Sequence, residues 1–326
     1  MTGIAVVGAG MWAPRLAAAA QRAGLELVAS YSRDPERRRE FAERFGCLAA
    51  ESFEAAVAHP EVEGVVLATP NDVHAEQAIA CAERGRHVLV EKPIADTVEA
   101  GERMRRACLD GGVVLMVGHG FRRLGAARRT RELLDEDRLG RVVLAEANFS
   151  LPGRFPPQAW RAHRARNPGG PLMQLGIHHV DTLRYWLGPV ERTTGVLAHV
   201  HTEADIDDVG VATLEFASGA LGVLSGSYVS PHTFSMRLLG TAGVLDYRVD
   251  LGTVWPQAER VDEAATLAVD GEPVDFEPRD MLADQLADFG RAIRGEAAVE
   301  TGADEGLAAL TVILDAVGAP AEEAVR

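Results

Sequence analysis

The sequence predicts an α/β protein with two domains: a doubly wound parallel sheet over residues 1–120, then an α+β domain with a mostly antiparallel, open sheet over residues 121–326. Three observations support this prediction. A chain of 326 residues is long for one hydrophobic core. Short apolar runs alternate with helical patterns up to about residue 120, and longer runs of alternating polarity follow.

The first domain is predicted from apolar runs of strand length that are separated by helical patterns. The runs lie at residues 3–10, 25–32, 62–70, 87–93 and 112–120. The helical patterns lie between them, at about 13–23, 35–45, 73–84 and 98–109. Buried strands that alternate with helices are typical of a parallel sheet with helices on both faces.

The second domain is predicted from longer strands in which apolar and polar residues alternate. The strands lie at residues 142–150, 209–216, 220–229 and 234–240, and helical patterns lie at about 126–134, 168–187, 281–294 and 303–317. Ala217-Ser218-Gly219 forms a tight connection between two of the strands, as an antiparallel hairpin requires. We therefore expect a sheet that is antiparallel for the most part.

Charge and composition argue against several classes of protein. The formal net charge is −15 and the sequence pI is about 5.1, so the chain as a whole would repel nucleic acid and anionic membranes. No apolar run approaches the roughly 18 residues of a membrane span, and the N-terminus lacks the pattern of a secretory signal. The three cysteines have no metal-ligand spacing. We expect a cytoplasmic protein with a small-molecule substrate, no nucleic-acid or membrane partner, and no metal site.

A glycine-rich turn follows the first predicted strand. It contains Gly8, Gly10, Met11 and Trp12 and leads into Ala13, which fits the pattern G-x-G-x-x-A. The first glycine allows a tight turn, and the second lets backbone amides approach a pyrophosphate at the N-terminus of the next helix. The strand–turn–helix context favours a dinucleotide site of the Rossmann type over an ordinary glycine turn.

The end of the second predicted strand bears on the choice between NAD and NADP. An acidic residue here normally holds the ribose 2′-hydroxyl of NAD. In this chain Ser32 takes that position and Arg33 follows, which suits a 2′-phosphate because a cation replaces the repulsive carboxylate. Arg37 could add a second contact, whereas Asp34 could instead bind the ribose. The pattern favours NADP and leaves NAD open.

Lys92 is the only lysine in the chain. It lies between an apolar run and Pro93, at the carboxyl end of its predicted strand, where ligands bind in doubly wound sheets. Lysine differs from arginine because its amine can lose a proton, especially in a partly desolvated place. From composition alone, sequence drift also explains why a single lysine occurs at this position.

The chain resembles the glucose–fructose oxidoreductase/inositol dehydrogenase (Gfo/Idh/MocA) family essentially from end to end. Four segments carry the resemblance: the glycine turn, Ala68-Thr69-Pro70-Asn71 with His74, Glu91-Lys92-Pro93, and the stretch MQLGIHHVD that ends at Asp181. The resemblance implies an NAD(P)-dependent oxidoreductase that acts on carbon–oxygen centres of sugars, cyclitols or their derivatives. It implies an active site between the domains, with Thr69, Asn71, His74 and Glu91 at the cofactor and Lys92 in proton transfer.

The stretch MQLGIHHVD is predicted to be helical. Helical spacing places Gln174, His178 and Asp181 along one face and turns His179 about 100° away. By resemblance, His178 is a general acid or base beside Lys92, and the other two residues of this face contact the substrate. Many relatives have an aspartate where this chain has Gln174. Because an amide cannot act as a base, we expect Gln174 to hydrogen-bond a substrate hydroxyl.

Two further residues, Arg123 and Trp160, are candidates for substrate contacts. Arg161, Arg164 and Arg166 near the second of these would favour an acidic or phosphorylated sugar, although a loop in an arginine-rich chain explains them equally well. Two other functions stay open: an enzyme that recycles NAD(P) internally during elimination or hydrolysis, and a non-catalytic NAD(P)-binding sensor. A broad sheet with an apolar outer face suits a homodimer or homotetramer.

Overall fold

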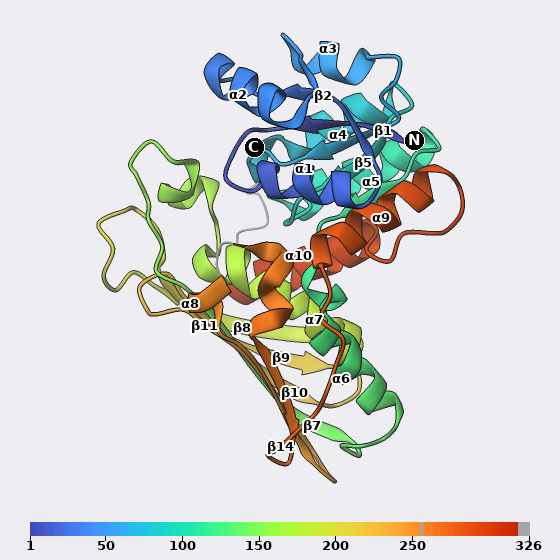
Figure 1. Ribbon diagram of the computed structural model, residues 1–326. Coiled ribbons are helices and arrows are strands. Elements are labelled where there is room, and N and C mark those ends of the chain that lie inside the picture. Colours follow the sequence, from blue (N-terminus) through green and yellow to red (C-terminus); the bar gives the residue numbers. More distant parts are fainter. Residues whose placement is uncertain (255–256, 319–326) are drawn as a thin grey trace. The chain divides into compact units, whose positions relative to one another are not determined.

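The computed structural model describes residues 1–254 and 257–318. They form two compact units, which are coloured along the sequence in Figure 1. The first unit comprises Met1–Gly120 and Asp280–Leu307, and the second comprises Phe121–Arg279 together with the chain from Ala308 onward. Within the described ranges, no helix is long and apolar enough to cross a membrane.

The first unit is built on a six-stranded parallel sheet. Its strands are β1 (Gly3–Val7), β2 (Glu26–Tyr31), β3 (Leu48–Ala49), β4 (Gly64–Leu67), β5 (His87–Val90) and β6 (Leu115–Val117). Their order is β3-β2-β1-β4-β5-β6, so the winding reverses its direction beside β1. The predicted doubly wound sheet of the Rossmann type is confirmed, and β3 is a short addition at its edge.

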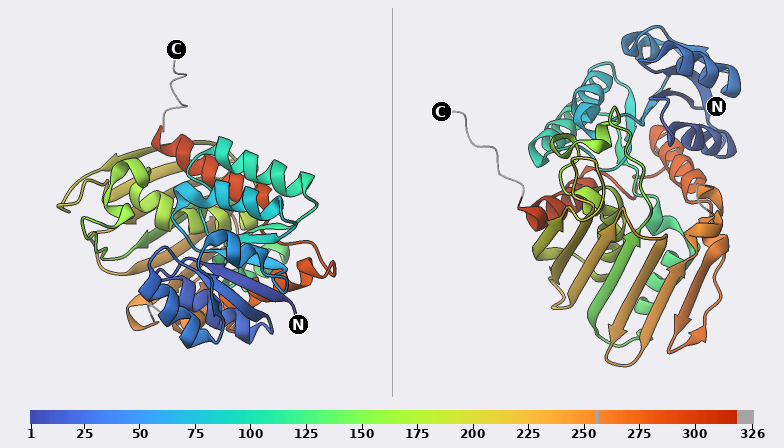
Figure 2. Two further views of the ribbon diagram at one scale, coloured as in Figure 1. Left: turned by 90° about the horizontal axis from the view of Figure 1, so that it is seen from above. Right: turned by 90° about the vertical axis from the view of Figure 1, so that its left-hand side faces the viewer.

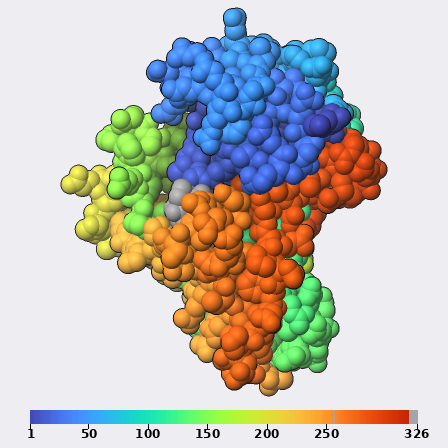
Figure 3. All heavy atoms as spheres, viewed as in Figure 1, coloured from blue at the N-terminus to red at the C-terminus, as the bar shows by residue number. Residues whose placement is uncertain are grey.

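Six helices accompany this sheet: α1 (Ala13–Arg22), α2 (Pro35–Phe45), α3 (Phe53–Ala58), α4 (His74–Ala82), α5 (Val98–Asp110) and α9 (Met281–Ile293). Side-chain caps determine where several of them begin. Asp34, Ser52 and Thr97 accept hydrogen bonds from backbone N–H groups in the first turns of α2, α3 and α5. Helix α2 is mostly charged, and its blue atoms lie at the surface in the space-filling view (Figure 3).

Helix α9 packs in the first unit, although the predicted boundary assigned it to the second. Phe289 and Ile293 of this helix pack against Gly64 of β4, where an added Cβ would lie 3.0 and 2.7 Å from their side chains. Arg22 of α1 also forms an ion pair with Asp280, the N-cap of α9, at 2.7 Å. The chain therefore returns to the first unit after residue 279.

The second unit contains an eight-stranded sheet in the order β14-β13-β12-β11-β7-β10-β9-β8. The strands are β7 (Val142–Ser150), β8 (Val190–Ala198), β9 (Val209–Phe216), β10 (Leu221–Ser227), β11 (Thr233–Gly240), β12 (Val244–Val249), β13 (Ala265–Val269) and β14 (Glu272–Pro273). Only the β7–β10 pair is parallel among the strand pairs that the structure describes in this sheet, so the predicted mostly antiparallel sheet is confirmed.

One face of this sheet is covered by helices, as the right-hand view of Figure 2 shows. Buried and accessible residues alternate along β9, β10 and β11, which is the pattern of a sheet with one covered face. The longer helices of the unit are α6 (Gly125–Asp135), α7 (Ile177–Leu187) and the C-terminal part of α10 (Ala303–Val317), and the shorter turns are α8 (Leu251–Val254), η2 (Phe121–Arg123), η3 (Trp160–Ala162), η4 (Arg164–Arg166), η5 (Leu172–Gly176) and η6 (Ala258–Ala264).

Candidate cofactor and catalytic residues

The carboxyl ends of three adjacent strands carry most of the predicted cofactor residues. Val7 of β1 is the register partner of Leu67 of β4, which is in turn the partner of Val90 of β5. The glycine turn and the pair Glu91-Lys92 follow directly, so they lie at one edge of the sheet. This edge, beside the reversal of winding at β1, is where doubly wound sheets bind ligands.

The glycine turn leaves its backbone open. Gly8 has a φ of 106°, and a Cβ on it would lie 2.4 Å from the carbonyl oxygen of Ala68, which excludes any side chain. A Cβ on Gly10 would meet no atom within 4 Å. Helix α1 begins at Ala13 without an acidic residue in its first turn. The backbone amides at the N-terminus of α1 are accessible, and this end of the helix dipole is positive. Both features suit binding of the pyrophosphate of a dinucleotide.

A hydrogen bond joins the glycine turn to the end of β5. Trp12 Nε1 donates to Glu91 Oε1 at 3.0 Å. Glu91 is 8% exposed, and its carboxylate packs against Gly118, where an added Cβ would lie 2.9 Å from Oε1. Lys92, the next residue, is half-buried. The turn that would hold the pyrophosphate and the segment that carries the lysine are thus tied together.

Asp34, which follows β2, directs its carboxylate toward the N-terminus of helix α2. Asp34 accepts hydrogen bonds from the backbone N–H groups of Glu36 and Arg37 at 3.0 and 3.2 Å. Arg37 Nε lies 3.4 Å from Asp34 Oδ2, so this arginine pairs with the same carboxylate. Arg33 is exposed beside Ser32. This arrangement favours Arg33 over Asp34 as the residue that meets the ribose end of a dinucleotide.

The segment after β4 is held by side chains that were predicted as cofactor contacts. Thr69 Oγ1 donates to Gln77 Oε1 at 2.7 Å, and Asn71, which is 5% exposed, begins the turn η1 (Asn71–Val73). His74 is 0% exposed. Its Nδ1 lies 3.1 Å from the carbonyl oxygen of Pro93, and its Nε2 lies 3.0 Å from that of Thr69. The ring therefore faces backbone carbonyls on both sides rather than an open surface.

In the second unit, His178 lies on α7 within an aromatic cluster. Its ring centroid is 4.4 Å from that of Phe121 and 5.9 Å from that of Phe149. The residue is 8% exposed. An imidazole that packs against apolar rings is held in one orientation, which a general acid or base requires.

A buried ion pair connects helix α7 to the turn η2. Arg122 donates from Nε to Asp181 Oδ2 at 2.8 Å and from its terminal nitrogen to Oδ1 at 2.6 Å. The two side chains are 7% and 1% exposed. Both carboxylate oxygens of Asp181, which was predicted to contact the substrate, accept from Arg122. The pair holds Phe121 and Arg123, which flank Arg122, beside the helix.

Gln174 and His178 lie on either side of a change from π-helix to α-helix. Gln174 lies in η5, a π-helical turn that precedes the α-helix. A π turn contains more residues than an α turn, so the α spacing used for the prediction does not apply across it. Within α7 itself the spacing of His178 and Asp181 is regular. Gln174 is 5% exposed.

The neighbouring His179 is a core residue. Its Nε2 lies 3.0 Å from the carbonyl oxygen of Asn148, and its ring packs 4.6 Å from Phe234 and 5.6 Å from Phe149. Burial lowers the pKa of His179 to about 4. The imidazole is therefore neutral in the folded protein near neutral pH.

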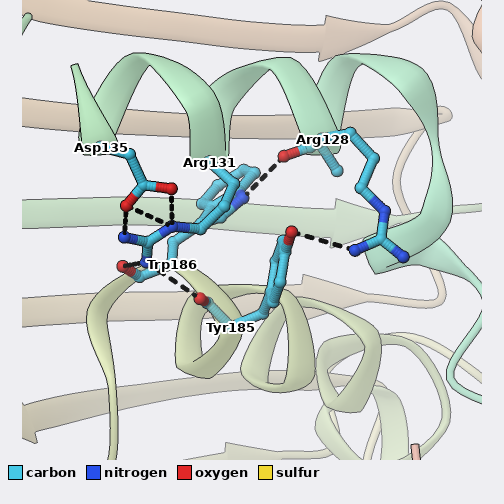
Figure 4. A network of polar contacts seen from close by, with 6 residues as sticks. Arg128, Arg131, Asp135, Tyr185 and Trp186 are labelled. Carbon is cyan, nitrogen blue, oxygen red and sulfur yellow. Dashed lines mark hydrogen bonds and ion pairs between the residues drawn. The ribbon is translucent and has the colours of Figure 1, made fainter. Parts of the chain in front are cut away.

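Two arginines of α6 join this helix to α7 (Figure 4). Arg131 donates to the carbonyl oxygen of Trp186 at 2.9 Å and pairs with Asp135, while Arg128 donates to the Tyr185 hydroxyl at 3.0 Å. Trp186 Nε1 donates to the carbonyl oxygen of Ala127 at 2.9 Å. These side chains stabilise the packing of the helix that carries His178.

Two arginines of the loop around Trp160 make contacts within the second unit. The Arg161 guanidinium lies 4.7 Å from the centroid of the Trp160 ring. Arg164 donates to Asp207 Oδ1 at 2.7 Å, so its charge is neutralised by a residue of the segment between β8 and β9. Within the two described ranges, no three His, Cys, Asp or Glu side chains are grouped so that they could hold a metal ion.

Three residues that the sequence analysis did not assign take part in these arrangements. Phe121 packs on His178, and no sequence pattern marked it. Arg122 pairs with Asp181, and no motif in the sequence marked it. Arg38 places a guanidinium nitrogen 3.4 Å from the carbonyl oxygen of Ser32, beside Arg33.

The fold and these residues define a dinucleotide-binding protein of two units, and comparison with known proteins assigns it to a family. Residues 2–119 match the family described as "Oxidoreductase family, NAD-binding Rossmann fold", and residues 127–246 match the "GFO/IDH/MocA C-terminal domain". The chain belongs to the Gfo/Idh/MocA family of NAD(P)-dependent oxidoreductases.

Its relatives include named sugar oxidoreductases. The chain is 32% identical over 298 residues to D-xylose 1-dehydrogenase (NADP(+)) 2 of Haloferax volcanii, which covers 87% of this chain and 86% of that protein. It is 28% identical over 305 residues to 1,5-anhydro-D-fructose reductase of Ensifer adhaerens, and the match covers 91% of this chain and 90% of that protein. Among solved structures, one described as an NADPH-dependent oxidoreductase of Desulfitobacterium hafniense matches with a TM-score of 0.92 and 35% identity, covering 97% and 94%.

Proposed function

We propose that this protein interconverts a carbinol and a carbonyl group of a sugar, a cyclitol or a sugar derivative, with NADP(H) as its cofactor and with Lys92 and His178 assisting proton transfer. The observation that carries the proposal is the edge of the first sheet. There, the carboxyl ends of β1 and β5, with β4 between them, carry the open glycine turn and the sole lysine at the same edge of the sheet. The relatives' names support the sugar class of substrate.

The residues of the first unit suit an NADP(H) molecule. Gly8 and Gly10 would hold the pyrophosphate on backbone amides, and Arg33 would pair with the 2′-phosphate. When bound, the nicotinamide accepts or donates the hydride that oxidation or reduction of the substrate carbon requires. The cap role of Asp34 supports NADP over NAD, because its carboxylate is engaged with α2.

The protein's own side chains then handle the proton. During oxidation, the amine of Lys92 takes the proton of the substrate hydroxyl as the carbonyl forms, and during reduction it returns that proton. His178, held by Phe121, relays or stabilises the charge that develops on the same oxygen. Gln174 cannot exchange protons, so we assign it to binding a substrate hydroxyl.

The experiment that tests this function is an assay for net cofactor turnover. Purified protein is incubated with NADP⁺ and a panel of aldoses, sugar acids, cyclitols and anhydrosugars, and the absorbance of NADPH is followed. We expect net NADPH formation with at least one member, and slower formation with NAD⁺. Product without net NADPH would instead indicate an internal redox cycle, and binding of cofactor without any product across the panel would indicate a sensor.

We also propose that the open face of the large sheet binds a second copy of the chain. Exposed apolar side chains lie on the open face of β8, β9 and β10: Val196, Val211, Leu221 and Val223. Next to them Glu146, Arg237 and Asp246 are successive register partners, so their charges alternate across the sheet. A two-fold axis that passes between Arg237 and Glu146 would set each of these two charges opposite its counterpart of the other sign in the second copy. Light scattering should give a dimer or tetramer, and Val223→Glu should shift it toward monomer.

A further inference from the structure

His74 connects two segments at the edge where the cofactor residues lie. One segment is Thr69, which follows β4, and the other is the irregular stretch from Glu91 to Thr97, which follows β5 and carries Lys92. The two ring nitrogens of His74 lie 3.0 and 3.1 Å from the carbonyl oxygens of Thr69 and Pro93. The ring is 0% exposed, so it cannot reach a cofactor without a rearrangement.

The second fully buried histidine of the chain provides a contrast. His179 also has 0% exposure, but only one of its nitrogens, Nε2, has a hydrogen-bond partner, the carbonyl of Asn148; its Nδ1 has none in the described structure. His179 anchors one strand and fills an aromatic core. The His74 ring instead spans two strand ends, and each of its nitrogens lies within hydrogen-bonding distance of a carbonyl oxygen.

We infer that His74 is a positioning residue: by bridging the Thr69 and Pro93 carbonyls it holds the Glu91–Thr97 segment, and with it Lys92, at the edge of the sheet. This inference rests on the proposed role of Lys92. It replaces the predicted direct contact of His74 with the cofactor by an indirect action through the backbone. Lys92 is one residue from the bridged carbonyl, so the bridge acts on the lysine through a single peptide unit.

The charge state of His74 determines how many of its two carbonyl contacts are hydrogen bonds. Burial lowers the pKa of His74, whereas the carbonyls of Thr69, Pro93 and Ile94 and the carboxylate of Asp72 act in the opposite direction. A neutral ring donates to one carbonyl, and a protonated ring donates to both. Of the other charged groups on the surrounding elements, Glu76 of α4 is paired with Arg103 of α5.

The test compares His74→Leu with His74→Asn. Leucine fills much of the space without a donor, whereas asparagine can place an amide near the position of Nδ1 and so keep a donor toward Pro93. In hydrogen-exchange mass spectrometry, a peptide covering residues 91–97 should exchange faster in His74→Leu than in the wild type. With NADP⁺ and a sugar substrate, kcat should fall about tenfold, as expected for a misplaced catalytic group, and the pH profile of kcat should change. His74→Asn should recover part of both effects, and the Kd for NADPH should stay within about threefold because the glycine turn is untouched.

Ser52→Ala is the matched control. Ser52 caps α3 in the same unit through the N–H of Ala55 at 3.0 Å, so its loss weakens that unit without touching the bridge. Unchanged exchange over residues 91–97 in His74→Leu would overturn the inference, and so would faster exchange with wild-type kcat. The proposed role of Lys92 fails on a different result, namely near wild-type turnover of Lys92→Arg. The exchange measurement reports on the bridge whichever way that experiment ends.

Discussion

The end of strand β5 and helix α7 hold their functional side chains in different ways. At the end of β5, Lys92 follows a short buried strand, and its neighbour Glu91 accepts a hydrogen bond at 3.0 Å from Trp12, which lies after β1. On α7, His178 depends on residues far away in the sequence, because Phe121 packs on its ring and Arg122 pairs with Asp181. Strand ends are set by sheet register, whereas the helix is set by side-chain packing and a buried charge pair. The two regions should therefore respond differently to substitution.

The largest effect is expected at the strand end, for Lys92→Arg. Arginine keeps the positive charge but cannot give up its proton near neutral pH, so kcat should fall by ~10²- to 10⁴-fold, nearly as far as in Lys92→Ala. Steady-state kinetics measures this loss. Because steric damage could mimic it, the pH profile is measured too, and the alkaline rise in kcat/KM for alcohol oxidation should change in both variants. Near wild-type turnover of the arginine variant would mean that Lys92 acts only as a charge or has no catalytic part.

Breaking the ion pair on α7 should affect stability. Asp181→Ala leaves the Arg122 guanidinium buried without its counter-charge, so the free energy of unfolding should fall by about 3–5 kcal/mol. Replacing both residues by leucine should cost much less than this, because no charge is then left buried. Urea unfolding of the single and double variants measures both. If Asp181 contacts substrate instead, Asp181→Asn would raise KM while leaving stability close to that of the wild type.

Kinetic measurements should also distinguish the roles of His178 and Gln174. His178→Ala should lower kcat by ~10²-fold, within the usual range for a general acid or base. Gln174→Ala should act mainly on KM, because an amide can bind a hydroxyl but cannot transfer a proton. Initial rates across substrate concentrations distinguish the two results. An equal loss of kcat in the glutamine variant, with normal substrate binding, would contradict the assignment.

The smallest effect is expected at the end of β2. Arg33→Ala removes one charge-assisted contact to a 2′-phosphate, so it should weaken NADP(H) binding by ~1–3 kcal/mol and leave NAD(H) binding nearly unchanged. Fluorescence titration with both reduced cofactors at moderate salt measures the ratio. Arg37→Ala is the control, because Arg37 already pairs with Asp34. Equal affinities of the wild type for NADPH and NADH would refute the preference itself.

The strand-end part of the candidate site could be predicted from local patterns. Gly8 lies directly after an apolar strand, and Lys92 directly before a proline, and both patterns are contiguous in the sequence. For the helix, the sequence predicted which residues belong to the candidate site but not how they are arranged. The π-helical turn that contains Gln174 has no signature in the stretch MQLGIHHVD, so the spacing argument assumed an α-helix throughout.

The sequence by itself determined the class of each sheet, the glycine turn and the place of Lys92, because alternating burial and turn chemistry act over a few neighbouring residues. Only the tertiary structure decided that α9 returns to the first unit, that Arg122 engages Asp181, and that His74 lies between two carbonyls. Each of these contacts joins segments that are distant in the sequence, from 19 residues apart for His74 and Pro93 to more than 200 for Arg22 and Asp280. Such pairings follow from the packing of the whole chain, since burial demands a partner for each polar group but the local sequence does not name it.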